Sequence, residues 1–440
     1  MLQTLADTAV LGADWLRMER PRARRIHREQ AGKHLALLAW ALPPTSSAGV
    51  YRPLSFMQYG CRLGWRIDAF CSEAPHTLRE HGEELLARVP REATLHVVPP
   101  SSREPSYRFF PRVDGGFANA LAYARHAIGT MSSDPPDVVM ASGPPFFTFV
   151  AARLVARHFG VPLVLDYRDE WTQCPFDFVD KGPHDRALES RCLRSADAVF
   201  FTTESHRRHQ LAAFPELDPR KTHLVPNGWE PSDFVEPERE PREPVLADVR
   251  TVRIAHVGNL PGHTAPGDFL DSLEMLLANE PEWRPRVHAQ FVGRRATSSD
   301  RALRSFKFPE LIEVVDHVGK REANRRMQES DVLLLLSRPD LERYLPGKLF
   351  DYLAARRPVL VFGSNGESSA LINRLGAGVL CSPGSGSALK DALLRLRRLD
   401  LAESAASVHA WLQEHRRDSL AARAFGIIDT LREARATASA

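Results

Sequence analysis

Short apolar segments alternate with segments of helical periodicity along almost the whole chain. In the first half the apolar segments are 34–42, 66–71, 95–99, 137–142, 162–167 and 197–203. In the second half they are 253–258, 288–293, 312–319, 331–337 and 358–363. Their apolar residues are nearly continuous instead of alternating, which is typical of strands buried on both faces of a parallel sheet. The pattern predicts an α/β protein with doubly wound sheets.

The alternation breaks once, at residues 229–250, where four prolines stand among many charged residues. No apolar period survives there, so we expect an interdomain linker. A chain of 440 residues is also too long for one core. We therefore predict an N-terminal domain over 31–228 and a C-terminal domain over 251–415. Residues 416–440 contain a helical period and could cross back to the N-terminal domain.

Residues 1–30 form a basic leader. Leu5, Ala9, Gly12 and Leu16 fall on one helical stripe, and six arginines follow between positions 17 and 28. The positive charge follows the apolar part, so this is not a signal peptide. No stretch approaches the ~18 apolar residues of a membrane span. Two interpretations stay open: a solvated leader, or a segment that docks on anionic lipid headgroups at the inner face of a membrane.

Composition narrows the class of protein. A hydrophobic fraction of 43% with 26% charged residues describes an ordinary globular chain, and a net charge of +3 is too small to indicate nucleic-acid binding. The five cysteines are scattered, without a CxxC pair. This pattern predicts neither a disulfide framework nor a structural zinc site, and it fits a reducing cytoplasm.

The segment 343–363, "RYLPGKLFDYLAARRPVLVFG", contains the most informative pair of charges. A helix is predicted to start at Pro346. Lys348 then lies in the first turn, where the helix dipole disfavours a cation. A phosphate bound at the helix N-terminus would stabilise it, and Asp351, one turn further, could accept hydrogen bonds from sugar hydroxyls. The alternative is that both residues are solvated surface residues.

Other candidates stand at the ends of predicted strands, where open parallel sheets bind ligands. Gly258 and Asn259 follow one strand, and a glycine turn before Arg294 follows another. Glycine at a strand end allows a ligand to approach the backbone closely. Neither GxGxxG nor GxxxxGK[ST] is present at these turns, so dinucleotide-binding and P-loop interpretations lose their main support.

The first half has its own charged strand end, "PLVLDYRDEW" at 162–171. Arg168 and Asp169 would face the cleft between the domains, unless they only tie down a loop. The small-residue loop 43–53, with Gly49 and Arg52, follows the first strand and could close over a substrate.

Together these segments resemble a glycosyltransferase of the two-domain GT-B fold, similar to glycosyltransferase family 4 of the polysaccharide-biosynthesis type. The resemblance rests on "AGVYRP", "DYRDEW", "PNG" at 226–228, "HVGNL" and "KLFDYLAARRPVLVF", and it covers about residues 35–430. It implies two Rossmann-like domains facing across a cleft. It also implies a retaining, metal-independent transfer of sugar from a nucleotide donor, without a further cofactor, to a glycan, lipid-linked or small-molecule acceptor.

The resemblance also assigns roles to residues. Lys348 would contact the donor diphosphate, Asp351 the ribose hydroxyls, and Arg294 would be a second phosphate contact. Two departures are visible. Arg343 stands where the family often has the first of two glutamates, and Arg168 stands where it often has a histidine. Two further functions therefore stay open: a nucleotide-sugar epimerase on the same plan, and a non-catalytic binding protein.

Overall fold

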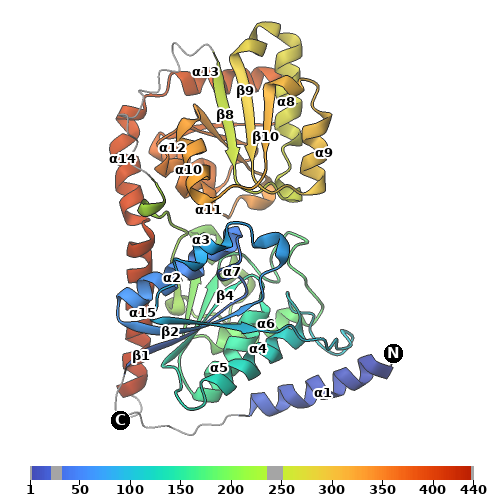
Figure 1. Cartoon of the computed structure of the whole chain (residues 1–440), viewed down its shortest axis with the longest axis vertical. Helices are drawn as coiled ribbons and strands as arrows, with labels where there is room; N and C mark the ends of the chain where they lie inside the picture. Colours follow the sequence, from blue (N-terminus) through green and yellow to red (C-terminus); the bar gives the residue numbers. More distant parts are fainter. Residues whose placement is uncertain (1, 21–31, 235–250, 438–440) are drawn as a thin grey trace. The chain divides into compact units, whose positions relative to one another are not determined.

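The computed structural model describes residues 2–20, 32–234 and 251–437. The chain divides into two compact units (Figure 1). Unit 1 combines Met1–Pro226 with Asp418–Ala440, and unit 2 is Asn227–Arg417.

Unit 1 is built on a seven-stranded parallel sheet. In spatial order its strands are β3 (Ala93–Val98), β2 (Trp65–Ser72), β1 (Lys33–Ala39), β4 (Val138–Gly143), β5 (Leu163–Tyr167), β6 (Ala198–Phe201) and β7 (Thr222–Leu224). The strand order reverses between β1 and β4, which is the switch point of a doubly wound fold, where ligands bind at the carboxyl ends of the strands.

Unit 2 repeats the plan with six parallel strands. In spatial order they are β10 (Ile312–Val315), β9 (Val287–Val292), β8 (Val252–Val257), β11 (Val332–Leu336), β12 (Val359–Phe362) and β13 (Gly378–Cys381). The switch point lies between β8 and β11. The two sheets confirm the predicted α/β, doubly wound fold class.

Helices cover both faces of each sheet. Those of unit 1 are α1 (Leu2–Glu19), α2 (Tyr51–Arg62), α3 (Gly82–Leu86), α4 (Phe117–Thr130), α5 (Phe147–Phe159), α6 (Asp185–Ser195), α7 (Glu204–Ala213) and α15 (Arg417–Thr437). Only the first residue of α15, Arg417, is assigned to unit 2. Helices α2 and α15 share one core with β1 and β2. Helix α5 packs on β1, β4 and β5 and against α4.

Unit 2 has helices α8 (Gly267–Asn279), α9 (Thr297–Ser305), α10 (Lys320–Glu329), α11 (Gly347–Ala354), α12 (Glu367–Leu375), α13 (Gly386–Arg397) and α14 (Leu401–Glu414). One core contains residues of α8, α9 and α13, and a second contains residues of α10, α11, α12 and α14. The sheet separates these two cores, because neighbouring residues of β8 and β11 alternate between them.

Part of the expected leader is integrated into unit 1. Helix α1 packs on α4 and α5. Leu11 is 1% exposed, and the Trp15 ring lies 5.3 Å from that of Phe117. Arg153 of α5 also donates two hydrogen bonds to the Glu19 carboxylate. Residues 2–19 are therefore a docked helix, and the arginines at 22–28 lie outside the described residues.

The described part of the expected linker belongs to unit 2. The Trp229 indole donates to the Leu412 carbonyl oxygen at 2.8 Å, and the Asn324 amide donates to the Asp233 carbonyl oxygen at 2.8 Å. Residues 235–250 lie outside the described residues. Trp229 and Phe234 supply the apolar surface that holds residues 229–234 in place, since both pack on the core of unit 2.

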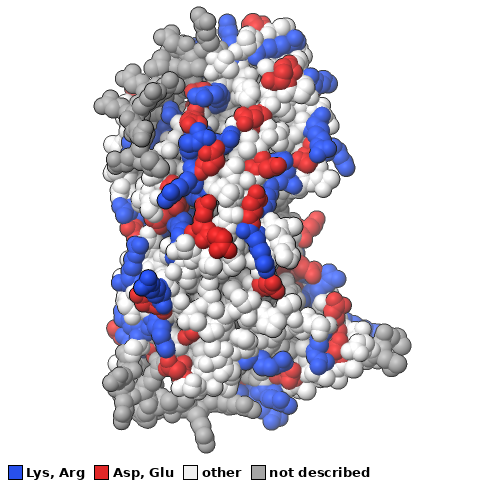
Figure 2. Space-filling model, in the orientation of Figure 1, with Lys and Arg blue, Asp and Glu red and all other residues white. Residues whose placement is uncertain are grey.

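None of the helices in the described segments is both long and apolar enough to cross a bilayer. On the face drawn in Figure 2, basic and acidic side chains are interspersed. This mixture agrees with the small net charge of +3.

Candidate functional site

Two glycine turns end β8 and β9 in unit 2. Gly258 and Gly293 have φ angles of 135° and 132°, a conformation that side chains rarely adopt. A Cβ atom at Gly293 would lie 2.6 Å from the Gly258 carbonyl oxygen. The glycines therefore allow the two turns to pack backbone against backbone at the carboxyl end of the sheet.

Lys348 lies over the first of these turns. It is the second residue of α11, whose N-cap is Pro346. Its ammonium donates to Nε2 of His256 at 2.9 Å and to the Asn259 carbonyl oxygen at 3.1 Å. The side chain is only partly exposed, and burial lowers the pKa of Lys348 to about 7. The structure thus brings Gly258, Asn259 and Lys348 together.

His256 is a member of this group that the sequence analysis missed. It is 1% exposed, and its Nδ1 lies 3.0 Å from the Leu334 carbonyl oxygen. A carbonyl oxygen only accepts, so Nδ1 carries the proton and Nε2 keeps a lone pair for Lys348. Burial, with a further contribution from the Lys348 charge, holds the pKa of His256 well below its usual range. The signal in the sequence was an imidazole among the buried residues of a mostly apolar strand.

Tyr352 fixes α11 on the sheet. Its hydroxyl accepts from the Val257 amide at 2.9 Å and lies 3.1 Å from the Val257 carbonyl oxygen. The side chain is completely buried. Val257 directly precedes Gly258, and Lys348 lies on the same helix as Tyr352. This contact therefore fixes the distance between Lys348 and the glycine turn.

Asp351 is held by a second lysine. Its Oδ2 accepts from the Lys320 ammonium at 2.5 Å, and the residue is 8% exposed. Oδ1 is buried and has no hydrogen-bond partner among the described residues. The carboxylate therefore keeps one oxygen available for a donor such as a sugar hydroxyl. Lys320, at the start of α10, is the second residue that sequence reasoning missed.

Arg294 lies at the predicted strand end. The next residue, Arg295, is engaged in ion pairs within the protein. Arg295 pairs with Asp300 at 2.7 Å and Asp316 at 2.6 Å, and it also donates to the Gly293 carbonyl oxygen. Arg295 therefore stabilises the turn. Arg294 is partly exposed, and the backbone at its position pairs with the chain that follows Gly258, since its carbonyl oxygen accepts from Leu260 at 2.9 Å.

The position of the family's first glutamate carries no carboxylate. Arg343 stands there with 19% of its side chain exposed, and the neighbouring Glu342 side chain is 56% exposed. Among the described residues, no group of three or more His, Cys, Asp and Glu side chains is placed to hold a metal ion.

In unit 1, Arg168 organises the loops at the carboxyl end of the sheet. Its guanidinium donates to the carbonyl oxygens of Gly49 at 2.6 Å and Gly143 at 3.2 Å, and to that of Pro144. A Cβ atom on Gly49 would lie 2.6 Å from Arg168 Nη1. The structure therefore brings Gly49 and Arg168 together, with the arginine tying down the loops that follow β1 and β4.

Arg52 requires a correction. It was predicted at the end of a loop that could close over a substrate, but it lies in α2 and is 8% exposed. Its guanidinium makes three hydrogen bonds of 2.6–3.0 Å to the Asp166 carboxylate and donates to the carbonyl oxygens of Val225 and Pro226. Its Nε, Nη1 and Nη2 atoms thus all donate within the protein. Arg52 is a structural residue that joins α2 to β5 and to the segment after β7.

Asp169 is a further carboxylate at this edge of unit 1. It is partly exposed, and its carboxylate makes no hydrogen bond with the described residues. Burial raises the pKa of Asp169, although the Arg168 charge opposes the change. A group of this kind can accept a hydrogen bond or a proton from an incoming hydroxyl.

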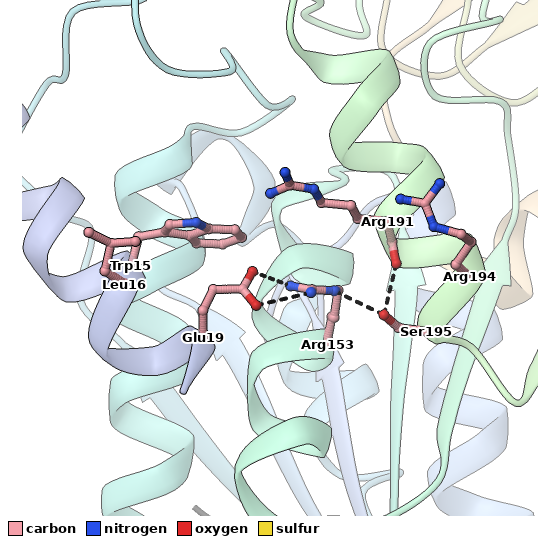
Figure 3. A pocket seen from close by; sticks show the side chains of 7 residues that line it. All are labelled: Trp15, Leu16, Glu19, Arg153, Arg191, Arg194 and Ser195. Carbon is pink, nitrogen blue, oxygen red and sulfur yellow. Dashed lines mark hydrogen bonds and ion pairs between the residues drawn. The ribbon is translucent and has the colours of Figure 1, made fainter. Parts of the chain in front are cut away.

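A hollow of about 360 Å³ lies elsewhere in unit 1, between α1, α5 and α6 (Figure 3). Its lining residues are Trp15, Leu16, Glu19, Arg153, Arg191, Arg194 and Ser195. Arg153 is bound to both Glu19 and Ser195. Ser195 ends the helix that leads into β6, so the hollow lies toward the amino ends of the strands, away from the predicted site.

Two family models match the chain in succession. A glycosyl transferase 4-like domain matches residues 49–228, and a glycosyl transferases group 1 domain matches residues 251–398. Together the two matches span most of the chain. A comparison with curated protein sequences found no match.

Solved structures share the fold at low sequence identity. Sucrose-phosphate synthase from Thermosynechococcus elongatus is 12% identical with a TM-score of 0.67, covering 91% of this chain and 100% of its own. HepE from Anabaena, in complex with UDP and glucose, is 12% identical with a TM-score of 0.62, covering 90% and 100%. WaaG, a glycosyltransferase of lipopolysaccharide biosynthesis, is 15% identical with a TM-score of 0.60, covering 89% and 98%.

Proposed function

Since this chain belongs to the glycosyltransferases of the GT-B fold that resemble family 4, we propose that it moves a sugar from a nucleotide-sugar donor to an acceptor hydroxyl. Unit 2 would bind the donor. The acceptor would be a glycan, a lipid-linked sugar or a small molecule, and unit 1 would bind it.

The observation that carries this proposal is the environment of Lys348. Its ammonium has three N–H groups, of which two donate to His256 and Asn259. No carboxylate of the described residues lies within ion-pair distance of it. A cation with one unused donor, above a glycine turn at the carboxyl end of a parallel sheet, suits a phosphate oxygen.

The rest of the donor site follows from that placement. Oδ1 of Asp351 is available for a ribose hydroxyl, and Arg294 stands at the neighbouring strand end. Negative charge develops on the diphosphate as it leaves the sugar, and Lys348 would stabilise it without a metal ion. HepE was solved with UDP and glucose. UDP sugars are therefore the first donors to test.

On the acceptor side, Asp169 would orient the incoming hydroxyl, and Arg168 would hold the surrounding loops in position. From the family resemblance we also expect the transferred sugar to keep its anomeric configuration. A retained product and undiminished turnover in excess chelator would support this chemistry, whereas turnover lost in chelator and restored by Mg²⁺ would contradict the metal-free route.

The first prediction tests the donor site. Lys348→Ala should weaken UDP about ten- to a hundredfold and leave uridine nearly unchanged, because it removes one charge-assisted contact to phosphate. Asp351→Ala should weaken both ligands by similar factors. Calorimetric titration measures this, with Lys307→Ala as the control, an exposed lysine of the same unit. Unchanged UDP affinity in Lys348→Ala would remove the basis of the proposal.

Product analysis separates the remaining functions. An epimerase would change the donor sugar without an acceptor, since its reaction needs no second substrate. A non-catalytic protein would bind UDP but turn over no donor with any acceptor. Transfer to an added acceptor, with release of the nucleoside diphosphate, would exclude both.

We also propose that the chain is cytoplasmic and contacts the inner face of the membrane through its N-terminal segment. In α1 the side chains of Leu5 and Leu16 are 51% and 65% exposed, and both residues precede the arginines in sequence. Changing the six arginines between 17 and 28 to glutamine leaves α1 in place, and each loss should cost roughly 1 kcal/mol of affinity for an anionic surface. Flotation with anionic vesicles should fall sharply, with neutral vesicles as the control. Equal flotation of both proteins would leave the solvated segment as the explanation.

A further inference from the structure

Two lysines make contacts at α11, Lys348 in the helix itself and Lys320 at the start of α10, and their charges have different partners. Lys320 pairs with the Asp351 carboxylate at 2.5 Å, so its charge is compensated. Lys348 is bound instead by two neutral acceptors, Nε2 of His256 and the Asn259 carbonyl oxygen. A carboxylate beside Lys348 would hold it equally well but would cancel the charge that an anion needs.

The imidazole can hold Lys348 only in one tautomer. His256 is buried in β8, and Nδ1 is committed to the Leu334 carbonyl oxygen of β11 at 3.0 Å. That hydrogen bond turns the Nε2 lone pair toward Lys348. Because β8 and β11 are paired neighbours at the switch point of the sheet, two central strands of unit 2 hold the acceptor in place.

Close packing completes the arrangement. A Cβ atom on Gly258 would lie 3.1 Å from Cε and 3.2 Å from Nζ of Lys348, so the side chain rests directly on the glycine turn. With Gly258 below it and acceptors on two of its N–H groups, the ammonium has one orientation that satisfies all contacts. Its third N–H is left for a ligand.

We propose that His256 is a positioning residue for the donor diphosphate: it accepts a hydrogen bond from Lys348, fixes the direction of the remaining N–H, and leaves the lysine's charge uncompensated. This inference rests on the proposed function. It extends that function by naming a residue that touches no substrate and acts through Lys348.

Two variants of His256 separate its two hydrogen bonds. In His256→Gln, the side-chain oxygen can occupy the place of Nε2 and accept from Lys348, but the bond to Leu334 is lost. In His256→Asn, the amide can replace Nδ1–H and donate to Leu334, but Lys348 loses its acceptor. Calorimetry with UDP and uridine, repeated with GDP, ADP and dTDP and their nucleosides, measures the phosphate-specific part of binding.

We expect His256→Asn to lose about tenfold in diphosphate affinity, with nucleoside affinity unchanged. This loss should not exceed that of Lys348→Ala, because the lysine itself is still present. His256→Gln should stay within about twofold of wild type, inside the context-dependent spread of a single neutral hydrogen bond. In the Lys348→Ala background, His256→Asn should have no further effect, because the two residues act as a unit.

A second measurement does not depend on a folded His256 variant. In protein labelled with ¹⁵N at histidine, Nε2 of His256 should give the signal of an unprotonated, hydrogen-bonded nitrogen. Lys348→Ala should shift that signal toward an unbonded lone pair, while addition of UDP to wild type should leave Nε2 unprotonated. A protonated Nε2, or no response to Lys348→Ala, would overturn the inference.

The outcomes distinguish this inference from the proposed function. If Lys348→Ala loses UDP affinity but His256→Asn does not, the inference fails and the donor site stands. If both His256 variants lose affinity equally, the imidazole supports the strand instead of orienting the lysine, and the inference also fails. If wild type binds none of the four diphosphates, the proposed function fails and the inference fails with it.

Discussion

At the scale of single residues, Lys348 combines two properties that oppose one another. It must be charged to bind a phosphate, yet burial lowers its pKa to about 7. Its neighbours do not relieve this cost, because His256 is held neutral, and the half-buried His263 also has a pKa lowered by burial and by nearby cations. A bound diphosphate would supply the missing negative charge and raise the pKa of the lysine.

This conflict predicts how UDP affinity depends on pH. Only the charged form of Lys348 binds the diphosphate, and this form becomes rarer as pH rises above its pKa. The affinity for UDP should therefore fall between pH 7 and pH 9, by at most about tenfold per pH unit. UDP itself is fully ionised in this range, because a terminal phosphate has a pKa of about 6. Lys348→Arg keeps its charge throughout and should give a nearly flat profile. The same slope in both proteins, measured by calorimetry, would assign the dependence to another group.

Residue patterns predicted which side chains lie near one another better than which contacts they make. The glycine turn and Lys348 were predictable, because a cation in a first helical turn and a glycine at a strand end each need a reason. Arg52 was misjudged, because an arginine after a small-residue loop looks the same in sequence whether it faces solvent or pairs with a buried carboxylate such as Asp166. His256 escaped because one polar residue inside a strand says nothing about its partner.

At the scale of elements, continuous apolar runs identified strands well. All of the predicted runs coincide with strands, because a parallel sheet covered by helices buries both faces of each strand. The two strands without a prediction, β7 and β13, are three and four residues long. Each lies at one edge of its sheet and contains too few residues for a period.

Helix α11 shows why the sequence could locate its charged residues on the helix but could not identify their partners. Its apolar positions predicted the buried face, and Leu349, Phe350 and Leu353 are indeed buried. The charged residues take their partners from other elements, Lys348 from β8 and Asp351 from α10. Such pairings depend on the order of strands in the sheet, which a single sequence does not give directly.

In the chain as a whole, the C-terminal helix α15 belongs to the same unit as the N-terminal half of the sequence. Residues from Asp418 onward belong to unit 1, although unit 2 lies between them and the rest of that unit in sequence. Ala424 and Ile428 of α15 are fully buried in the same core as β1 and β2. In Figure 1, α15 runs beside α2 on this unit. The stability of unit 1 therefore depends on the last segment of the chain.

Phe425 provides the test of this dependence. Its ring lies 5.6 Å from that of Trp65 and is 1% exposed, and Gly60 lacks the Cβ atom that would lie 2.3 Å from it. Phe425→Ala should lower the unfolding free energy of unit 1 by about 3–5 kcal/mol, since it leaves a cavity in a closely packed core. UDP affinity should not change, because the proposed donor site is built from unit 2 alone.

The matched variant is Phe269→Ala, which removes a fully buried ring from the core of unit 2. It should lower the stability of unit 2 by a similar amount and leave unit 1 unaffected. Hydrogen exchange of peptides from each unit, followed through a urea titration, separates the two effects because each unit has its own core. If Phe425→Ala instead weakens protection in both units equally, then the two cores unfold as one cooperative structure. In that case α15 contributes to the stability of the whole chain, and the independence of unit 2 is refuted.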